Sequence, residues 1–341
     1  MILTTGGTGY IGSHTVVELQ NAGFDVLIAD DLSNSKQEVV DRIEQISGKR
    51  PFFEKVDLKN KEKTFELFQK YPNIEAVIHF AASKAVGESV ENPLKYYENN
   101  IGSLVNVLQA MQKHDVASIV FSSSCTVYGQ PEILPVTEQT KRKAAESPYG
   151  NTKMISEDIL KDHSVSDKSF KIIALRYFNP IGAHPSGLIG ELPNGIPNNL
   201  VPFVTQTAYG LRTTLSVFGN DYDTPDGSCI RDYINVVDLA EAHVVAIKRL
   251  LENKNKSNFE YFNIGTGHGV SVLEIVRTFE KVSNTKLNYQ IVGRRAGDIE
   301  KIWAETSFAN TELGWKAKKT LNETLLSAWN WEQKYRASLT E

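Results

Sequence analysis

The sequence contains only two cysteines, Cys125 and Cys229, and they are far apart in a chain of 341 residues. Two isolated thiols cannot form the disulfide framework of a small secreted protein, so we expect both to be reduced in the cytoplasm. The seven histidines are scattered, and neither a His-x-x-x-His nor a Cys-x-x-Cys pair occurs. These are common metal-binding spacings, and their absence predicts that the protein holds no metal ion.

Long apolar runs and an excess of one charge are also absent. No apolar run approaches the ~18 residues that a membrane-spanning helix needs, and the first residues lack the basic region of a signal peptide. The formal net charge is −4 without a basic stripe, which argues against nucleic acid as a partner. The composition, 41% hydrophobic and 23% charged, is that of a globular protein, and the length suits two joined domains.

Strand-like and helix-like segments alternate through residues 1–178. Short apolar segments typical of buried strands are predicted at residues 2–5, 25–29, 51–56, 75–81, 117–122 and 170–177. Helices are predicted between them, at residues 11–22, 59–70, 94–114 and 149–163. Such βαβ units predict an α/β fold with a Rossmann-like, doubly wound parallel sheet.

This rhythm changes in the second half of the chain. Residues 179–230 are rich in Pro, Gly and Asn and are predicted to form long, irregular functional loops. A strand and a helix are then predicted within 232–251, a strand at 261–265 and a helix at 272–282. We therefore expect a first domain at 1–178 and a smaller C-terminal α/β substrate domain at 179–341. Parts of the second domain, around 232–265, are expected to return to the first, with the ligands in the cleft between the two.

Gly6, Gly9 and Gly12 follow the first predicted strand and open the first predicted helix. This spacing gives a tight turn, lets the backbone approach a pyrophosphate, and places that pyrophosphate at a helix N-terminus. Asp30 and Asp31 end the second predicted strand, where a carboxylate accepts hydrogen bonds from the adenine ribose and repels a 2′-phosphate. The first domain is therefore predicted to bind NAD rather than NADP.

Tyr149 and Lys153 are spaced i, i+4 in a predicted helix, so both side chains lie on the same face. A phenol with an unperturbed pKa of about 10 needs a nearby cation to act as a general base at neutral pH. Lowering that pKa by ~3 units requires roughly 4 kcal/mol, which a lysine and a charged nicotinamide can supply. Ser124, after the fifth predicted strand, can pass a substrate proton to Tyr149. Together these residues predict redox chemistry at a hydroxyl-bearing carbon.

These motifs resemble those of the extended short-chain dehydrogenase/reductases and, within them, the UDP-glucose 4-epimerases. The resemblance extends over nearly the whole chain and also rests on residues 80–82, 176–182, 195–200, 218–222, 231–234 and 294–298. It implies a homodimer in which Tyr149, Lys153 and Ser124 are catalytic. It implies that NAD is held by Gly6, Gly9, Tyr10, Ile11, Gly12, Asp30, Asp31, Leu32, Ser33, Asn34, Ser35, Asp57, Leu58, Phe80, Ala81, Ala82, Ser83, Lys84, Asn99, Ser122, Tyr149, Lys153 and Phe178. It implies that the UDP-sugar is held by Lys84, Ser124, Tyr149, Tyr177, Asn179, Asn199, Leu200, Ser216, Val217, Phe218, Arg231, Arg295, Asp298 and Ile302.

The activity that the resemblance implies is epimerisation at C4, in which UDP-glucose and UDP-galactose interconvert through a transient 4-keto sugar. A nucleotide-sugar 4,6-dehydratase or decarboxylase is an alternative, but both kinds of relative carry acidic residues where this chain has Cys125-Thr126. A non-catalytic NAD-binding regulator is a second alternative, and it would be expected to have lost the Tyr149/Lys153 pair. Ile302 stands where relatives restricted to glucose and galactose carry tyrosine, so we expect UDP-N-acetylglucosamine to be accepted as well.

Overall fold

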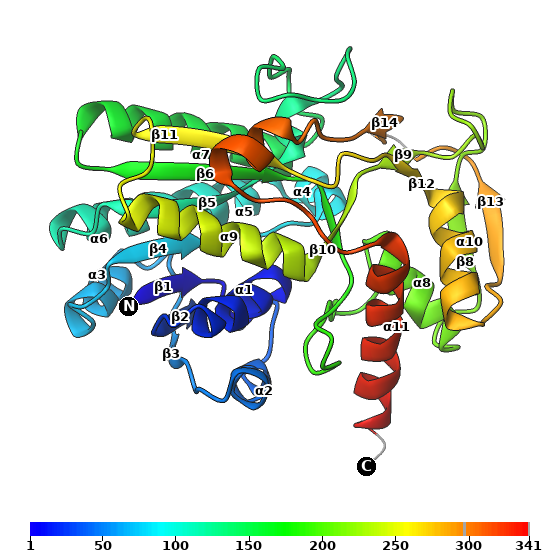
Figure 1. Ribbon diagram of the computed structural model, residues 1–341, viewed down its shortest axis with the longest axis horizontal. Coiled ribbons are helices and arrows are strands. Elements are labelled where there is room, and N and C mark those ends of the chain that lie inside the picture. The colour runs from blue at the N-terminus through cyan, green and yellow to red at the C-terminus, as the bar shows by residue number, and fades with distance from the viewer. Residues whose placement is uncertain (296–297, 340–341) are drawn as a thin grey trace.

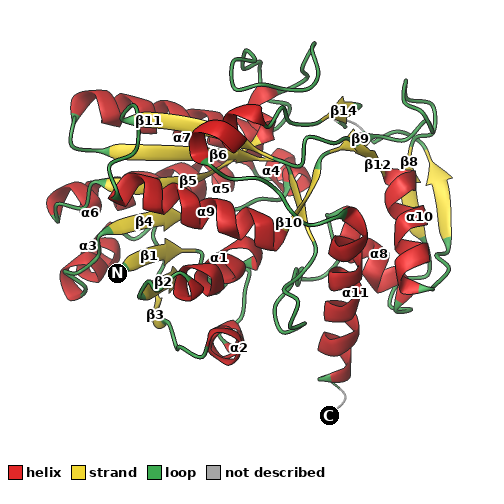
Figure 2. Ribbon diagram, in the orientation of Figure 1, coloured by secondary structure: helices red, strands yellow, loops and turns green. Residues whose placement is uncertain are grey.

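The computed structural model describes residues 1–295 and 298–339, and its largest element is a seven-stranded parallel sheet. The strand order is β11-β6-β5-β4-β1-β2-β3 (Figures 1 and 2). The bounds of these strands are β1 Ile2–Thr5, β2 Val26–Asp30, β3 Phe52–Lys55, β4 Ala76–His79, β5 Ser118–Ser124, β6 Lys171–Tyr177 and β11 Phe259–Ile264. The order reverses direction beside β1, so the predicted Rossmann-like, doubly wound sheet is confirmed.

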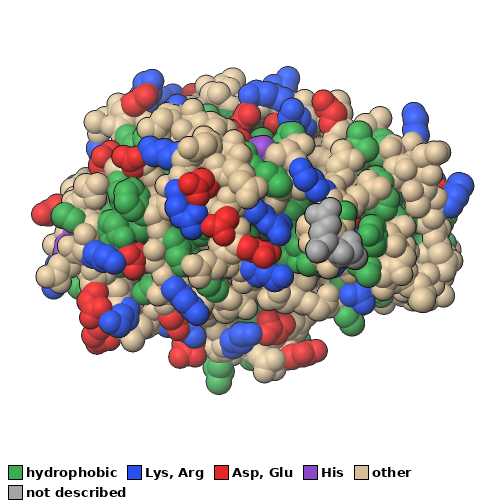
Figure 3. Space-filling model, turned by 90° about the horizontal axis from the view of Figure 1, so that it is seen from below, with side chains coloured by type: hydrophobic (Ala, Val, Ile, Leu, Met, Phe, Trp, Pro, Cys, Tyr) green, Lys and Arg blue, Asp and Glu red, His purple; other side chains and the backbone are tan. Residues whose placement is uncertain are grey.

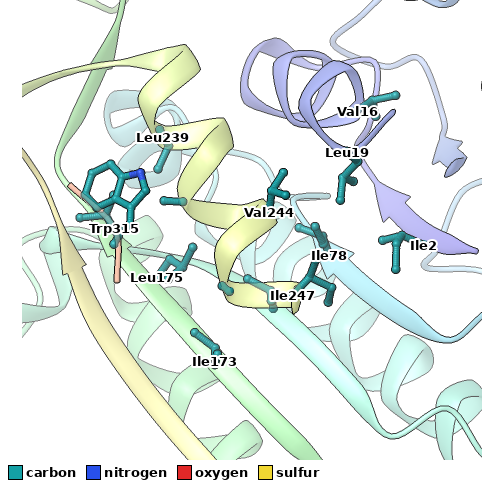
Figure 4. Packing of buried hydrophobic residues seen from close by; sticks show 14 of the residues in the cluster. Ile2, Val16, Leu19, Ile78, Ile173, Leu175, Leu239, Val244, Ile247 and Trp315 are labelled. Atoms are coloured by element: carbon teal, nitrogen blue, oxygen red, sulfur yellow. The ribbon is translucent and has the colours of Figure 1, made fainter. Parts of the chain in front are cut away.

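Helices cover both faces of the sheet. The first face carries α1 (Tyr10–Asn21), α2 (Glu38–Ser47) and α9 (Val236–Leu251). The second face carries α3 (Lys61–Lys70), α6 (Ser103–Lys113) and α7 (Pro148–Ser166). Successive strand residues point to opposite faces, so Ile2 joins the core under α1 and α9, whereas Leu3 joins the core under α3 and α6. Figure 4 shows the first of these cores, with Ile2, Ile78 and Ile173 of the sheet near side chains of α1 and α9.

The second half of the chain builds a separate apolar core around α8 (Leu200–Ala208), α10 (Val272–Ser283) and α11 (Leu321–Ala337), seen at the right of Figure 1. Its short strands are β7 Asn179–Ile181, β8 Leu215–Phe218, β9 Ile230–Arg231, β10 Tyr233–Asn235, β12 Val270–Ser271, β13 Tyr289–Val292 and β14 Lys301–Ile302. Two elements of this half belong to the large sheet, because α9 packs against α1 and β11 pairs with β6. The division of the chain into domains at residue 178 stays a prediction.

Two stretches differ from the sequence prediction. The helix predicted at 94–114 is three elements, namely α5 (Pro93–Tyr97), a π-helical turn (Glu98–Gly102) and α6. Residues 179–230, predicted to be irregular, contain β7, α8 and β8. The π-helical turn adds a residue to one turn of backbone, and such turns are frequent at functional sites. A short helix, α4 (Val86–Glu91), precedes α5.

The surface offers no sign of a membrane segment or of a one-sided charge. In the described part of the chain, no helix has both the length and the apolar character needed to cross a bilayer. On the face seen in Figure 3, basic and acidic side chains are interspersed rather than gathered in one patch. This distribution agrees with the small net charge of −4.

Candidate active site

The turn between β1 and α1 is shaped by glycines that no other residue could replace. Gly6 has φ +68°, and a Cβ atom there would lie 2.9 Å from the amide nitrogen of Ala81. A Cβ atom on Gly12 would lie 2.2 Å from the carbonyl oxygen of Gly6. The N-cap of α1 is Gly9, so no side chain caps the helix. Tyr10 and Ile11 begin this helix beside the turn, which leaves backbone at a helix N-terminus to receive a phosphate.

Asp30, the last residue of β2, ties this turn to the loop that follows. Its carboxylate accepts hydrogen bonds from the backbone N–H groups of Thr8 (3.1 Å) and Leu32 (2.9 Å) and from the Ser35 hydroxyl (3.1 Å). Leu32 has φ +63°, which is uncommon for a residue with a side chain, and the Asp30 bond holds it there. Asp31 accepts from Ser33 N–H (2.8 Å) and thereby closes the same loop.

The loop after β4, from Phe80 to Lys84, lies against the π-helical turn. Ser83 N–H donates to the side chain of Asn100 (2.8 Å), and Asn99 donates to the Ser83 hydroxyl (3.2 Å). The Phe80 ring lies 4.7 Å from that of His243, and Ala81 and Ala82 are the small residues of the loop. After β3, at the edge of the sheet, Asp57 is exposed at a turn, whereas the Leu58 side chain is buried in the core and could meet a ligand only through its backbone.

The carboxyl end of β5 faces α7, which carries Tyr149 and Lys153. The Ser124 side chain lies close enough to the Tyr149 phenol to oppose the rise of its pKa. Lys153 Nζ donates to the carbonyl oxygen of Ser122 (2.6 Å) and lies 5.9 Å from the centre of the Tyr149 ring. The Ser122 hydroxyl meets the Tyr177 hydroxyl at 2.5 Å. The predicted catalytic residues are therefore brought together, and both Tyr149 and Lys153 are buried.

Burial opposes charge at both groups. It raises the pKa of Tyr149 well above its ordinary value, the neighbouring Tyr177 raises it further, and the Ser124 side chain opposes these effects. Burial lowers the pKa of Lys153 to about 8, although Glu157 opposes this shift. A deprotonated Tyr149 thus depends strongly on the positive charge of Lys153.

The predicted substrate residues near α8 form one network with Lys84. Asn199 is the N-cap of α8, directly before Leu200, and its side chain donates to Glu191 (2.6 Å). Lys84 Nζ pairs with the same carboxylate (3.1 Å). Asn179, in β7, donates through its backbone to Asp232 O (2.9 Å), and Phe178 before it is buried. Glu191 therefore joins a predicted cofactor residue to a predicted substrate residue.

The predicted diphosphate-binding arginines lie on the second half of the chain. Arg231 lies in β9, and its guanidinium donates to Ile230 O (2.9 Å). Arg295 pairs with Asp298 (2.6 Å) and lies over the Phe218 ring, with 5.3 Å between the guanidinium carbon and the ring centre. Ala296 and Gly297, within the predicted segment 294–298, lie outside the described residues.

Three further predicted substrate residues differ in their exposure. In β8 the Val217 side chain is part of the apolar core, whereas Ser216 is only partly buried. Ile302, in β14, is paired with Arg231 and is buried in one apolar cluster with Cys125 and Phe178.

A cavity of about 360 Å³ lies elsewhere, and Tyr149 does not line it. Its lining residues are Lys36, Leu192, Pro193, Asn194, Gly195, Gln206, Leu211, Arg212, Tyr335 and Arg336.

Sequence reasoning missed Asn100, Glu191 and Glu157. Asn100 stands beside the predicted Asn99, and the π-helical turn that aims both side chains at Ser83 is not visible in the sequence. Glu191 lies in a Gly-rich segment far from Lys84 in the chain, so no spacing signal marks their contact. Glu157 follows Lys153 by one helical turn, and this i, i+4 spacing was a usable signal.

Comparison with known proteins assigns this geometry to a family. A sequence profile described as GDP-mannose 4,6 dehydratase matches residues 3–327. The UDP-glucose 4-epimerase of Bacillus subtilis (strain 168) is 52% identical over 331 residues, which are 97% of this chain and 96% of that protein. The chain belongs to the UDP-glucose 4-epimerase family. The UDP-glucose 4-epimerase of Dictyostelium discoideum is 51% identical over 97% of this chain and 95% of its own length.

Solved structures of UDP-glucose 4-epimerases share the fold over almost the whole chain. The enzyme from Bifidobacterium longum, in complex with NAD+ and UDP, has a TM-score of 0.94 at 46% identity and covers 98% of both chains. The UDP-Glc/GlcNAc 4-epimerase from Campylobacter jejuni has a TM-score of 0.84 at 35% identity and covers 98% of this chain and 99% of that one. The predicted resemblance to the UDP-glucose 4-epimerases is confirmed, while the profile marks the wider group that includes dehydratases.

Proposed function

We propose that the protein interconverts UDP-glucose and UDP-galactose at C4, with NAD as its cofactor and a transient 4-keto sugar as the intermediate. The observation that carries this proposal is the group formed by Ser124, Tyr149 and Lys153 at the carboxyl end of β5. Ser124 lies beside the Tyr149 phenol, and Lys153 Nζ lies 5.9 Å from the ring centre. Family membership at 52% identity to an epimerase supports the same reaction.

The residues of the first half fit a dinucleotide. The glycine turn has no room for a Cβ atom at Gly6 or Gly12, so its backbone can approach a pyrophosphate at the uncapped start of α1. Asp30 places a buried carboxylate beside this turn, which suits ribose hydroxyls and disfavours a 2′-phosphate. These residues would hold NAD, which would supply the hydride acceptor and donor for oxidation and re-reduction at the sugar C4.

The protein's own part in this reaction is proton transfer. Tyr149, as phenolate, removes the proton of the sugar 4-hydroxyl and gives it back after the keto sugar has turned over. Ser124, which lies beside the Tyr149 phenol, holds the sugar 4-hydroxyl in place during this transfer. Arg231 and Arg295 anchor the diphosphate by paired N–H donors, so that the sugar can turn over while UDP stays fixed.

Replacing Tyr149 tests this assignment. Tyr149→Phe keeps the ring and removes the phenol, so we expect kcat for UDP-galactose to fall by about 10² or more, the usual range for a lost general base. Affinity for UDP, measured by calorimetry, should stay unchanged. Tyr289→Phe, an exposed tyrosine of β13, is the matched control and should keep full activity. Near-normal turnover of Tyr149→Phe would show that another group is the base.

The dehydratase and decarboxylase alternatives lack their proton donor here. Elimination of water needs an acid and a base near the sugar, but the corresponding positions hold Cys125 and Thr126. Burial raises the pKa of Cys125 to about 12, so the thiol keeps its proton at neutral pH. A non-catalytic regulator is disfavoured because Tyr149 and Lys153 are both present and in contact with β5.

Acceptance of UDP-N-acetylglucosamine is a finer proposal, and it rests on Ile302. This side chain is buried beside Cys125 and Phe178, and it lacks the ring and hydroxyl of a tyrosine. A pocket difference of this size is worth only ~1–3 kcal/mol, so a reduced rate is expected rather than exclusion. Ile302→Tyr should suppress the N-acetyl activity while sparing the plain hexoses. Equal damage to both substrates, or no N-acetyl activity in the wild type, would rule this residue out as the gate.

We also propose that the protein is a homodimer and that it acts in galactose metabolism in the cytoplasm. Support for a dimer comes from Val86, Val90 and Leu94, three exposed apolar side chains on α4 and α5. Exposed apolar side chains gathered on neighbouring elements are typical of a protein interface. Light scattering of the purified protein should give twice the chain mass of 38.0 kDa, and a mass of one chain would refute the dimer.

A further inference from the structure

The three serines that end β5 each meet a different residue of α7. Ser124 lies beside the Tyr149 phenol, the Ser122 carbonyl accepts from Lys153 at 2.6 Å, and the Ser123 hydroxyl donates to Glu157 at 2.6 Å. The first two contacts belong to the proposed catalytic group. The third lies beneath them, where Ser123 is 0% and Glu157 2% exposed.

Glu157 is also half of a buried ion pair with Arg176 of β6. The guanidinium donates twice, from Nε to Oε1 (2.9 Å) and from Nη2 to Oε2 (2.6 Å). Arg176 is itself held by Tyr128, whose hydroxyl accepts a hydrogen bond at 3.1 Å, and by the Tyr261 ring, 4.1 Å from the guanidinium carbon. A two-pronged pair in the interior fixes both distance and orientation, so it sets where α7 lies against the sheet.

We propose that Glu157 is a positioning residue for catalysis, which holds α7 against β5 and β6 and keeps Lys153 in its charged form. The inference rests on the proposed function of Tyr149 and Lys153. Glu157 follows Lys153 by one helical turn, so its carboxylate lies on the same face of α7 and is the anion nearest in sequence to the ammonium. Removing that anion makes a charged Lys153 less favourable, and the phenolate of Tyr149 then loses its support.

The groups that face this cluster come from every neighbouring element, and its carboxyl groups are Glu157 and Glu138. Burial raises the pKa of Glu138, and the charge of Arg176 opposes that shift. Burial and the charge of Lys153 lower the pKa of His79 to about 3, so this imidazole is neutral at working pH. Tyr177 and Cys125 have pKa values raised to about 12 by burial and are neutral as well. The groups so placed are Tyr149 and Glu157 of α7, His79 of β4, Arg176 and Tyr177 of β6, Cys125 and Tyr128 after β5, Tyr96 of α5, and Glu138 and Arg142 of the loop before α7, where Arg142 lies 3.6 Å from Glu157.

Two variants that break the same ion pair test the proposal, because they leave opposite charges behind. Glu157→Gln leaves the positive charge of Arg176 without this counterion, which lowers the pKa of Lys153. The alkaline limb of the kcat profile, where kcat falls as Lys153 loses its proton, should therefore move to lower pH. Arg176→Gln leaves Glu157 with only the more distant Arg142 (3.6 Å) as a counterion, so the same limb should move to higher pH. For a fall of about one pKa unit at Lys153, we expect Glu157→Gln to lose about twofold in kcat at pH 7 and close to tenfold at about pH 9, relative to the wild type. Glu157→Asp keeps the charge and should leave the limb in place, even if its shorter side chain lowers kcat.

The control is a second Arg–Glu pair on the opposite face of the sheet, between α9 and β11. Arg249 donates to both oxygens of Glu260 (2.8 and 2.9 Å), and both side chains are largely buried. Glu260→Gln should lower the melting temperature without moving the pH profile. The inference would be overturned if the alkaline limb lay at the same pH in wild type, Glu157→Gln and Arg176→Gln. It would also be overturned if both variants moved the limb in the same direction. A wild type that does not convert UDP-galactose would instead refute the proposed function.

Discussion

Lys153 is the charge on which the proposed base depends, and Lys153→Met isolates its contribution. Methionine keeps most of the length and apolar contact of the side chain but removes the ammonium. Burial raises the pKa of the Tyr149 phenol, and the variant lacks the ammonium that would lower it. The variant should therefore hold less phenolate at any given pH. We therefore expect activity to fall at neutral pH and to return partly as the pH rises.

The size of the effect follows from the distance between the two groups. Lys153 Nζ lies 5.9 Å from the centre of the Tyr149 ring, and at an effective dielectric constant of about 20 this gives roughly 3 kcal/mol. That energy corresponds to about 2 pKa units, or about 10² in the phenolate fraction. The expected loss in kcat at neutral pH is thus about 10²-fold, with the acid limb of the profile displaced upward by about 2 units.

The assay is initial-rate conversion of UDP-galactose to UDP-glucose across a series of pH values at saturating substrate. Lys161→Met is the matched control, because Lys161 lies on the same helix with an exposed side chain and should be replaceable without loss. A Lys153→Met variant whose loss is the same at every pH would refute the electrostatic reasoning. A loss below threefold would show that another cation stabilises the phenolate.

Three further outcomes are expected. Arg231→Ala should weaken UDP binding by about 1.5–3 kcal/mol, the range of a charge-assisted hydrogen bond, and calorimetry that shows no change would place the diphosphate elsewhere. Gly12→Ala should abolish retention of NAD, because its Cβ would lie 2.2 Å from the carbonyl oxygen of Gly6; Gly87→Ala, with open space around the added methyl group, should be neutral. The purified protein should carry NAD(H) without addition, so a nucleotide-free supernatant after denaturation would contradict a retained cofactor.

The sequence predicted the elements whose signal is local. The six strands predicted in the first half agree with β1 to β6, and all of these except β3, which is Phe-Phe-Glu-Lys, are short buried runs that contain consecutive apolar residues. The helices α2 and α11 were overlooked although their signals are local too. In α2, Val40 and Ile43 are the buried residues, and α11 opens with a capping box between Thr320 and Glu323.

The contacts that complete the site could not be predicted in this way. Arg176 pairs with Glu157 from a different strand, and Glu191 meets Lys84 across the two halves of the chain. Such pairs depend on how the elements pack, and no periodicity encodes them. The motif residues of the site were predictable because glycine turns and i, i+4 pairs fix their chemistry within one segment.

The position of β11 at the edge of the large sheet has a consequence during synthesis of the protein on the ribosome. When β6 emerges, its outer edge has no partner, and the apolar side chains that later lie under α9 are open to water. Both surfaces stay uncovered until α9 and β11 have also been made. An open strand edge beside an apolar face is the kind of surface on which nascent chains associate. The growing chain therefore most needs a chaperone after β6 has emerged and before α9 and β11 have been made.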